Sequence, residues 1–249
     1  MTESNSIKAT DGVVLIMTCD KYSQYWSSLY HYMKQLWDYN IPWQICLCTE
    51  DYHPIINDPK WSCLTVGKGS FHERQKKALE HFKDYKYIFF MLEDFWPTRP
   101  MTYEMFAGLF AKMVEHDWDC LHVDTMRPEL YKVETSDVSF NGKKFLRMCN
   151  DGEWLYNQQA AFWKRELLCD CTVAGEIPEE AVMTTLSFEQ CCDRYMRKNF
   201  PQAKVMLYHY WWYPRSGVVW RGELSLIGKE MDVHMHIDNY CKDILKINK

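Results

Sequence analysis

The sequence has 249 residues, of which 47% are hydrophobic and 25% charged, so it has the composition of a globular protein with a sizeable core. Its net charge of −5 argues against nucleic acid as the main partner, because a phosphate backbone requires a basic surface. Aromatic residues make up 16%, and aromatic faces beyond those that a core needs suit the stacking of sugars or bases. A large, aromatic-rich core is the alternative explanation.

Two features bear on the cellular location. Residues 1–12 are polar and lack the apolar stretch of a secretion signal, and no part of the sequence is long and apolar enough to span a membrane. The 11 Cys show no C-x-x-C spacing, so they match neither a zinc site nor a disulfide framework. We therefore expect reduced thiols and a cytoplasmic location, which would be the host cytoplasm if the protein is viral.

Strands and helices alternate through the first half of the chain. Continuous apolar runs predict buried strands, and apolar residues at helical spacing predict amphipathic helices. We expect strands over 13–19, 43–48, 61–66, 87–92 and 120–123, and helices over 23–37, 71–82 and 103–114. This order predicts an α/β fold with a mostly parallel sheet flanked by helices.

The second half of the chain has a mixed pattern. Short alternating segments from 131 to 146 surround Asn141-Gly142, a hairpin turn signal that predicts a small antiparallel part. Helices are predicted near 164–168, 187–197 and 239–245, with a strand at 204–208. No linker or repeat divides the chain, so we expect a single domain, with 1–124 as its nucleotide-binding half and 125–249 as its acceptor and catalytic half.

Two adjacent carboxylates follow the most apolar strand. The run Tyr87–Leu92 leads directly into Glu93 and Asp94, and Pro97 is the next turn signal. Open α/β sheets bind their ligands at the carboxyl ends of the strands. The sequence therefore predicts that a metal ion or a phosphate-bearing ligand is bound beside these two acids.

The end of the first strand lies at the same predicted edge of the sheet. Thr18, Asp20 and Tyr22 follow this strand, and neither G-x-G-x-x-G nor G-x-x-x-x-G-K-[ST] occurs in the chain. A nucleotide would therefore be held by side chains and a cation. Asp20 could accept hydrogen bonds from a uracil or ribose edge; alternatively, Asp20 and Glu93 only cap the helices that follow them.

The order and spacing of several short segments resemble nucleotide-sugar-dependent glycosyltransferases of the GT-A type, particularly bacterial and viral members that act on surface glycans. The resembling segments lie between Val13 and Gly222, at 18–22 with Trp26, 71–79, 92–95, 156–164, 186–189 and 221–222. The resemblance implies a GT-A-like, Rossmann-like fold, a donor sugar linked to UDP, GDP or TDP, and a glycan acceptor.

The same resemblance implies roles for three polar residues. Arg74 is similar to an arginine that faces the donor diphosphate, Gln159 lies near the donor sugar, and Arg221 lies in a basic turn near the C-terminus. Guanidinium groups bind phosphate through two parallel hydrogen bonds, so the two arginines could neutralise the diphosphate without a metal ion.

Glu93 and Asp94 take the place of the D-x-D motif of that family, in which one residue separates the two acids. Adjacent residues of an extended chain point to opposite faces, so we expect only Asp94 to bind a divalent cation, Mn²⁺ or Mg²⁺, directly. His234 and His236 are another candidate metal pair, although two histidines near a chain end are also ordinary surface residues.

Inverting glycosyl transfer requires a carboxylate that removes the proton of the acceptor hydroxyl. Glu189 is the first candidate, because it lies near the start of a predicted helix, where the helix dipole alone would also favour an acid. Asp151 and Glu153 are the next candidates. Aromatic residues that suit either a sugar platform or the core are Trp154, Tyr156, Trp163 and the run 210–213.

We therefore predict a glycosyltransferase that moves a hexosyl or deoxyhexosyl group to a glycan, with Asp94 and Glu189 as its catalytic residues. A sugar-nucleotide nucleotidyltransferase is one alternative, although such an enzyme would require a glycine-rich basic loop after the first strand, and residues 19–21 do not form one. A non-catalytic glycan-binding module is the other, because it would explain the aromatic residues without the acids. Exposed aromatic residues would also allow a dimer.

Overall fold

The structure, a computed structural model, describes residues 7–97, 99–123, 131–173, 185–210, 219–220, 223–224 and 246–248. The first half of the chain alternates strands and helices, as expected. Its strands are β1 (Gly12–Met17), β2 (Ile45–Thr49), β3 (His53–Ile55), β4 (Trp61–Thr65), β5 (Tyr87–Leu92) and β6 (Cys120–His122). Its helices are the 3-10 helix η1 (Asp20–Tyr25) and the α-helices α1 (Trp26–Leu36), α2 (Phe71–His81) and α3 (Tyr103–Glu115).

The second half adds an antiparallel hairpin, two helices and several short strands. The hairpin strands are β7 (Val133–Phe140) and β8 (Lys143–Met148), and the helices are α4 (Arg165–Val173) and α5 (Thr185–Asn199). The remaining strands are β9 (Ala161–Lys164), β10 (Val205–Leu207), β11 (Val219–Trp220), β12 (Glu223–Leu224) and β13 (Lys246–Asn248). Within the described residues, no helix is long and apolar enough to cross a bilayer.

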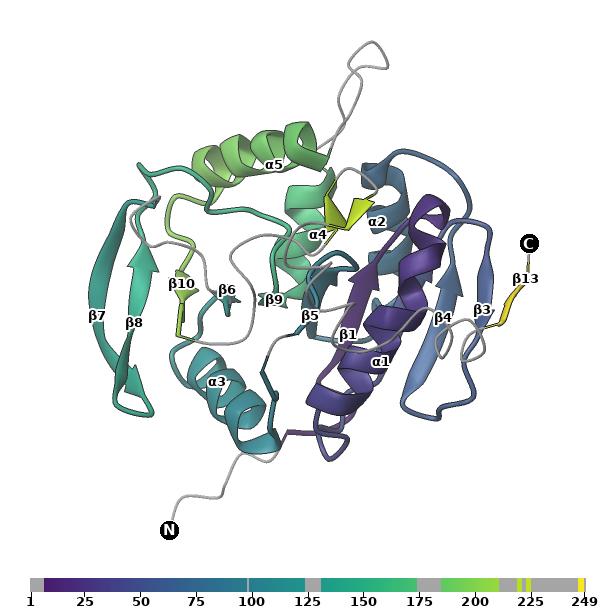
Figure 1. Cartoon of the computed structure of the whole chain (residues 1–249). Helices are drawn as coiled ribbons and strands as arrows, with labels where there is room; N and C mark the ends of the chain where they lie inside the picture. Colours follow the sequence, from purple (N-terminus) through teal and green to yellow (C-terminus); the bar gives the residue numbers. More distant parts are fainter. Residues whose placement is uncertain are drawn as a thin grey trace.

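One sheet runs through both halves of the chain (Figure 1). The order of its strands is β4-β2-β1-β5-β9-β6-β10-β8-β7. Strands β4, β2, β1 and β5 are parallel, whereas β9 is antiparallel to both β5 and β6. β10 is parallel to β6, and the β7–β8 hairpin adds an antiparallel end. The expected α/β class, with its antiparallel part in the second half, is confirmed.

The two faces of the sheet are covered by different helices. Val14 and Phe89 belong to a core that includes α1 and α3, whereas Val13 and Ile88 belong to a second core that includes α2, α4 and α5. Successive side chains of a strand point to opposite faces, so strands buried on both sides are apolar at every position. The continuous apolar runs of the sequence have this cause.

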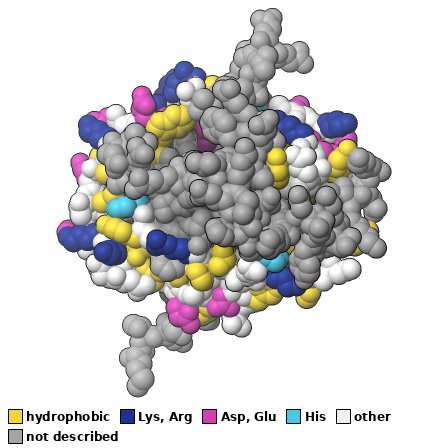
Figure 2. Space-filling view, viewed as in Figure 1, with side chains coloured by type: hydrophobic (Ala, Val, Ile, Leu, Met, Phe, Trp, Pro, Cys, Tyr) yellow, Lys and Arg dark blue, Asp and Glu magenta, His cyan; other side chains and the backbone are white. Residues whose placement is uncertain are grey.

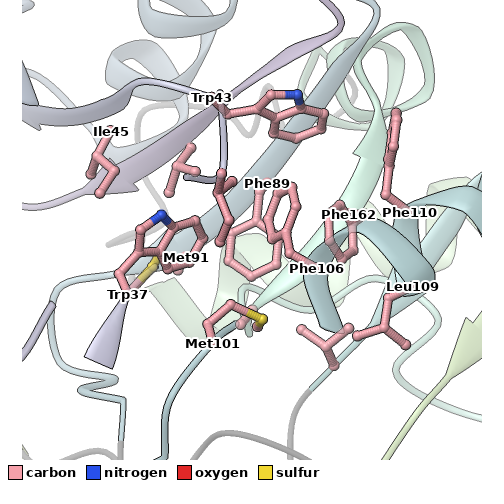
Figure 3. Packing of buried hydrophobic residues seen from close by; sticks show 14 of the residues in the cluster. Trp37, Trp43, Ile45, Phe89, Met91, Met101, Phe106, Leu109, Phe110 and Phe162 are labelled. Carbon is pink, nitrogen blue, oxygen red and sulfur yellow. The ribbon is translucent and has the colours of Figure 1, made fainter. Parts of the chain in front are cut away.

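Aromatic rings fill much of the first core (Figure 3). Trp43 is fully buried and lies edge-to-face against Phe106 and Phe110, with ring centroids 5.1 and 5.0 Å apart. The ring centroid of Phe162, on β9, lies 4.7 Å from that of Phe89, on β5, and 4.7 Å from that of Phe106. Such pairs stabilise a core beyond the area that they bury. Core packing therefore accounts for a large part of the high aromatic content.

The carboxyl ends of the parallel strands lie at one edge of the sheet. From β1 the chain adds β2 and β4 on one side and then returns to add β5 on the other, so the strand order reverses between β1 and β5. Such a reversal creates the crevice in which open α/β sheets bind ligands. β9 starts at the same edge, because its residue Ala161 pairs with Phe90 and with His122.

Several element boundaries differ from the sequence prediction. The expected helix 23–37 is split into η1 and α1, and α4 is longer than the predicted 164–168. Periodicity alone did not predict β9, which has only four residues and is buried between β5 and β6. The helix expected near 239–245 lies outside the described residues.

Candidate active site

A tight turn after β5 fixes the two adjacent acids. The Phe95 backbone N–H donates to the Leu92 carbonyl at 3.3 Å, and the Trp96 indole N–H donates to the Glu93 carbonyl at 3.0 Å. Trp96 is fully buried and stacks on Tyr32, with ring centroids 5.3 Å apart. The residue that departs from a D-x-D pattern therefore anchors the turn that carries the acids.

Glu93 is buried on the side of the site nearest β1. Burial raises the pKa of its carboxyl well above the usual value, and the nearby charge of Asp94 raises this pKa further. The positive charges of Arg74 and Lys21 act in the opposite direction and lower the pKa. No helix starts directly after Glu93, since α3 is capped by Thr102, so the capping alternative for Glu93 is wrong.

Asp94 lies on the other side of the same turn. Its Oδ1 atom is buried and has no hydrogen-bond partner in the part of the chain that the structure describes. Burial raises the pKa of its carboxyl to about 7. A buried carboxylate oxygen without a partner is costly, and its occurrence at a predicted ligand edge indicates a place where a ligand group or ion binds.

Glu189 comes from a distant part of the chain and lies near enough to Asp94 for the two charges to interact. Its Oε1 atom accepts a hydrogen bond from the Gln158 backbone N–H at 2.6 Å. Burial raises the pKa of Glu189 to about 7, the Gln158 N–H lowers it, and the negative charge of Asp94 raises it. Glu189 is the fifth residue of α5, and no acid occupies the first turn of this helix, so a first-turn dipole role does not explain it.

Asp20 has a different local role from the one expected. Its carboxylate accepts hydrogen bonds from the backbone N–H groups of Glu50, Asp51 and Tyr52, at 3.2, 2.9 and 3.1 Å. In return, the Glu50 carboxylate accepts the Asp20 N–H at 2.9 Å. Asp20 therefore fixes the loop that follows β2, and its side chain does not cap η1. Whether it also contacts a nucleotide stays a prediction.

Arg74 is buried beneath the ends of β1 and β2. Its guanidinium donates to the Thr18 carbonyl, and its Nε atom lies 3.6 Å from Oε1 of Glu50. A capping box at the start of α2 positions the helix that carries it: Ser70 Oγ accepts from the Glu73 N–H at 3.2 Å, and Glu73 Oε2 accepts from the Ser70 N–H at 2.7 Å. Arg74 thus supplies fixed positive charge at the predicted diphosphate position.

The other predicted ligand contacts lie at the same edge where the structure describes them. Thr18 Oγ1 accepts from the Trp26 indole N–H at 2.8 Å. Tyr22 is half-buried, with the Lys21 ammonium 4.8 Å from its ring centroid. Gln159 is half-buried just before β9, and its backbone N–H donates to Asn157 Oδ1 at 3.0 Å. Arg221, the pair at 234 and 236 and the aromatic residues 211–213 lie outside the described residues.

The alternative bases and the aromatic platform are placed differently. Asp151 and Glu153 are exposed, and Asp151 forms an ion pair with Lys132. Tyr156 and Trp163 are fully buried core residues, so neither is available as an open sugar platform. Two further candidates for such a platform are half-buried: Trp154 and Tyr210.

Sequence reasoning did not single out two residues of the site. Glu50 follows a buried strand directly, as Glu93 does, so the rule that identified Glu93 also applied to it. Gln158 acts mainly through its backbone N–H, and no side-chain pattern reveals such a role.

The donor set suits a weakly held cation. Among the described residues, no three His, Cys, Asp or Glu side chains come together as a metal cluster. Asp94 could supply one carboxylate oxygen, and a bound diphosphate and water would have to supply the rest. Mg²⁺ is commonly held in this way, by one or two carboxylates together with substrate phosphates.

Comparisons with known proteins support the fold. No family model and no curated protein matches the sequence. The structure of S. aureus TarS 1-349 in complex with UDP-GlcNAc is similar over 85% of this chain and 60% of that one, with 15% identity and a TM-score of 0.51. The fold is of the GT-A type. The UTP-bound UGPase from Acinetobacter baumannii is similar over 92% of this chain and 94% of that one, with 8% identity and a TM-score of 0.52.

The GT-A-like fold expected from the sequence is confirmed by these structures. The chain spans about three fifths of the TarS 1-349 structure, and at such low identity the similarity concerns the fold alone. Both TarS and a UTP-bound UGPase have folds similar to this one. The fold therefore does not decide the chemistry, which depends on the residues of the site.

Proposed function

We propose that this protein is a glycosyltransferase that moves a sugar from a nucleotide-diphosphate sugar to a glycan acceptor. The observation that carries the proposal is a pair of acids at the ligand edge, where the strand order reverses between β1 and β5: Asp94 has a buried oxygen without a partner among the described residues, and its charge acts on Glu189. The pKa of each carboxyl is raised to about 7. Environments that perturb titratable groups in this way are typical of catalytic sites. UDP-sugars are the first donors to test, because the similar TarS structures contain UDP-GlcNAc and UDP.

Glu189 is the proposed general base. A pKa near the working pH is the optimum for proton transfer, and the Gln158 N–H holds one carboxylate oxygen while the other receives the proton. In an inverting transfer, the acceptor oxygen forms a bond to the anomeric carbon as the bond to the diphosphate breaks on the opposite face. The acceptor proton goes to Glu189, and the diphosphate leaves as an anion.

The leaving diphosphate would meet positive charge at the ends of β1 and β5. Arg74 lies beneath this edge, and Lys21 is exposed beside it. A divalent cation bound at Asp94 would neutralise further charge on the diphosphate. Asp94 in this proposal orients the donor and holds the cation, and the Glu50 carboxylate, 3.6 Å from Nε of Arg74, pairs with the charge of the arginine.

Donor binding can be tested by thermal shift with UDP-, GDP- and TDP-sugars, with and without Mn²⁺. A donor present at 100 times its Kd should stabilise the fold by about 2.7 kcal/mol. Uridine, which lacks the diphosphate, is the control ligand and should give a much smaller shift. A chain that shows no shift with any nucleotide or nucleotide-sugar would contradict the transferase proposal.

The base assignment can be tested with Glu189→Gln. The variant should bind the donor as the wild type does, because Gln retains the size of the side chain and an oxygen for the Gln158 N–H. Transfer to acceptor should fall by about 10²–10⁴-fold. Glu153→Gln, a change at an exposed acid that was the alternative base, should leave turnover unchanged. Full activity of Glu189→Gln would show that another group is the base.

A sugar-nucleotide nucleotidyltransferase is the second candidate, because the UTP-bound UGPase structure matches nearly the whole chain. The segment after β1 argues against it, since Thr18–Lys21 contains no glycine. Incubation with UTP and sugar 1-phosphates distinguishes the two candidates: a nucleotidyltransferase releases pyrophosphate, and a glycosyltransferase does not. A glycan-binding module would show neither reaction and would bind glycans without nucleotide.

A further inference from the structure

One face of α5 binds the chain segment that contacts the proposed base. Glu189, Asp193 and Arg197 are four residues apart, so they lie on the same face of the helix. Each of them hydrogen-bonds to the backbone of segment 152–158. We call these three side chains, with the segment that they bind, the α5 clamp.

The three contacts of the α5 clamp follow one another along the segment. Glu189 Oε1 accepts from the Gln158 N–H at 2.6 Å, and Asp193 Oδ1 accepts from the Tyr156 N–H at 3.3 Å. The Arg197 guanidinium donates to the Gly152 carbonyl at 2.9 Å and pairs with Asp193 Oδ2 at 2.8 Å. Asp193 is therefore the central member, in contact with both the segment and Arg197.

A second set of hydrogen bonds involves the side chain of Tyr156, within the same segment. Tyr156 Oη accepts from the side-chain amide of Gln158 at 2.5 Å and from that of Gln75, on α2, at 3.0 Å. Gln75 also donates to Thr172 Oγ1, on α4, at 2.8 Å. The segment is thus held by α5 and, through Gln75, by α2, which is itself hydrogen-bonded to α4. These contacts restrict movement of the Gln158 N–H away from Glu189.

The position of Asp193 is costly to maintain. Its side chain is buried, and burial raises the pKa of its carboxyl, while the Tyr156 N–H and the Arg197 charge lower it. Apolar residues would pack a helix against a loop with no such desolvation cost. Trp154, within the segment, has a φ of +68°, a conformation that a bulky side chain rarely adopts, so the segment must be held in place by its contacts. The hydrogen bond from the Tyr156 N–H, rather than simple packing, explains why a carboxylate occupies position 193.

We propose that Asp193 is a positioning residue for Glu189. Asp193 holds Tyr156 and Arg197, the segment between Gly152 and Gln158 is thereby fixed, and the Gln158 N–H keeps the Glu189 carboxylate turned towards Asp94. The inference rests on the proposed function of Glu189 as the base. Asp193 itself touches no reacting atom, so its effect on turnover must pass through Glu189.

Steady-state kinetics of Asp193→Ala test this role. The variant should lower kcat by about 10–100-fold, as expected for a displaced catalytic group, and leave the donor KM within about threefold. Asp193→Asn retains an oxygen for the Tyr156 N–H and should recover most of the lost kcat. Arg194→Ala, an exposed change on the same helix, is the control and should leave both constants unchanged.

A double mutant separates positioning from a general loss of structure. If Asp193 acts through Glu189, then Asp193→Ala should lower the residual kcat of Glu189→Gln by much less than it lowers the kcat of the wild type. Equal losses in both backgrounds, a wild-type kcat for Asp193→Ala, or a parallel loss of kcat and donor affinity would each overturn the inference.

Amide hydrogen exchange provides a readout that does not depend on catalysis. Exchange at Gln158 should become faster in Asp193→Ala and remain slow in Asp193→Asn and Arg194→Ala. Unchanged exchange at Gln158 in Asp193→Ala would overturn the inference. If the wild-type protein transfers sugar from no donor but the exchange pattern is as expected, the proposed function fails while the α5 clamp stands.

Discussion

Two charged residues at the ligand edge are held in place by contacts within the protein, which their sequence positions alone did not indicate. Asp20 and Arg74 were expected to face a nucleotide, and both are held by the protein itself: Asp20 by three backbone N–H groups and Arg74 by the Thr18 carbonyl and Glu50. Preorganised charges of this kind need not rearrange when a charged ligand arrives. By contrast, Asp94 has a buried oxygen that lacks a partner among the described residues.

The buried carboxyl of Asp94 makes a prediction about stability and pH. Its pKa is raised from 3.8 to about 7, so the folded state favours the protonated form and loses stability as the pH rises from about 4 through 7. Asp94→Asn cannot ionise. We therefore compare the Tm of Asp94→Asn with that of the wild type, without metal or nucleotide. The Tm of the variant minus the Tm of the wild type should be a few degrees higher at pH 8.5 than at pH 5.

The measurement is thermal unfolding in a chelating buffer at both pH values. Asp84→Asn, which removes an exposed acid in the turn between α2 and β5, is the control and should show the same Tm difference from wild type at both pH values. An Asp94→Asn variant with no pH-dependent gain would mean that the carboxyl is already ionised and compensated in the folded protein.

At this scale, the sequence identifies residue types and their strand ends, but not their partners. Asp94 and Glu93 could be found because acids directly after a buried strand fall at the ligand edge. The hydrogen bonds of Asp20 could not be found, because its partners lie 30 to 32 residues further along the chain and are backbone groups. Glu189 was identified, but its contact with Gln158 depends on the path of a loop.

At the scale of elements, β1 packs closely against its neighbours where it begins, at the end of the strand opposite the ligand edge. Gly12 starts β1 and pairs with Tyr87 of β5. A Cβ atom at this position would lie 2.5 Å from the Trp43 ring and 2.6 Å from the Tyr87 carbonyl oxygen. Trp43 is fully buried among other rings and Tyr87 contributes a backbone atom, so neither can easily move.

Gly12→Ala should therefore destabilise the protein by about 1–3 kcal/mol, as overpacked cores generally do. Urea unfolding followed by tryptophan fluorescence measures the loss. Thr10→Ala, at an exposed position two residues earlier, should change the free energy of unfolding by less than about 0.5 kcal/mol. Equal stability of Gly12→Ala and wild type would show that β1 and β5 can separate without cost.

The long buried strands and amphipathic helices were predictable because their apolar spacing reflects burial directly. β9 was not, because four residues are too few to establish a period and because its burial depends on β5 and β6, which lie much earlier in the sequence. The split between η1 and α1 was also hidden, since Tyr22, Tyr25 and Trp26 continue the same aromatic pattern across the boundary.

At the scale of the whole molecule, the distribution of surface charge agrees with the composition of the sequence. Figure 2 shows acidic and basic side chains interspersed over the described part of one face, without a continuous basic area there. This distribution agrees with the net charge of −5 and with the expectation that nucleic acid is not the main partner.

The cysteines give a prediction for the whole chain. Ten of the 11 Cys lie in the described residues and all ten are free thiols, of which Cys46, Cys48, Cys120, Cys171 and Cys192 are buried. Burial raises the pKa of Cys46 to about 12, which makes its reactive thiolate scarce. Thiol titration without reductant should therefore count all 11 in denaturant, and these five should react slowly in the native protein. A lower count in denaturant would reveal a disulfide.

The fold class could be predicted from the order of elements, and the GT-A type from short segments spread along the chain. The chemical class could not be decided in the same way, because the fold is similar to both TarS and a UGPase. What distinguishes them is where a few oxygen atoms lie relative to a ligand, and spacing along the sequence does not contain that information.

The place of β9 in the sheet has a consequence for dissection of the protein. β9 supplies the hydrogen bonds on the inner edges of both β5 and β6, yet it is made only after the chain has passed residue 160. A fragment that ends near residue 124 would contain β1 to β6 but expose two apolar strand edges, which are templates for aggregation. The two halves of the chain are thus interleaved, and we expect neither to be soluble when expressed alone.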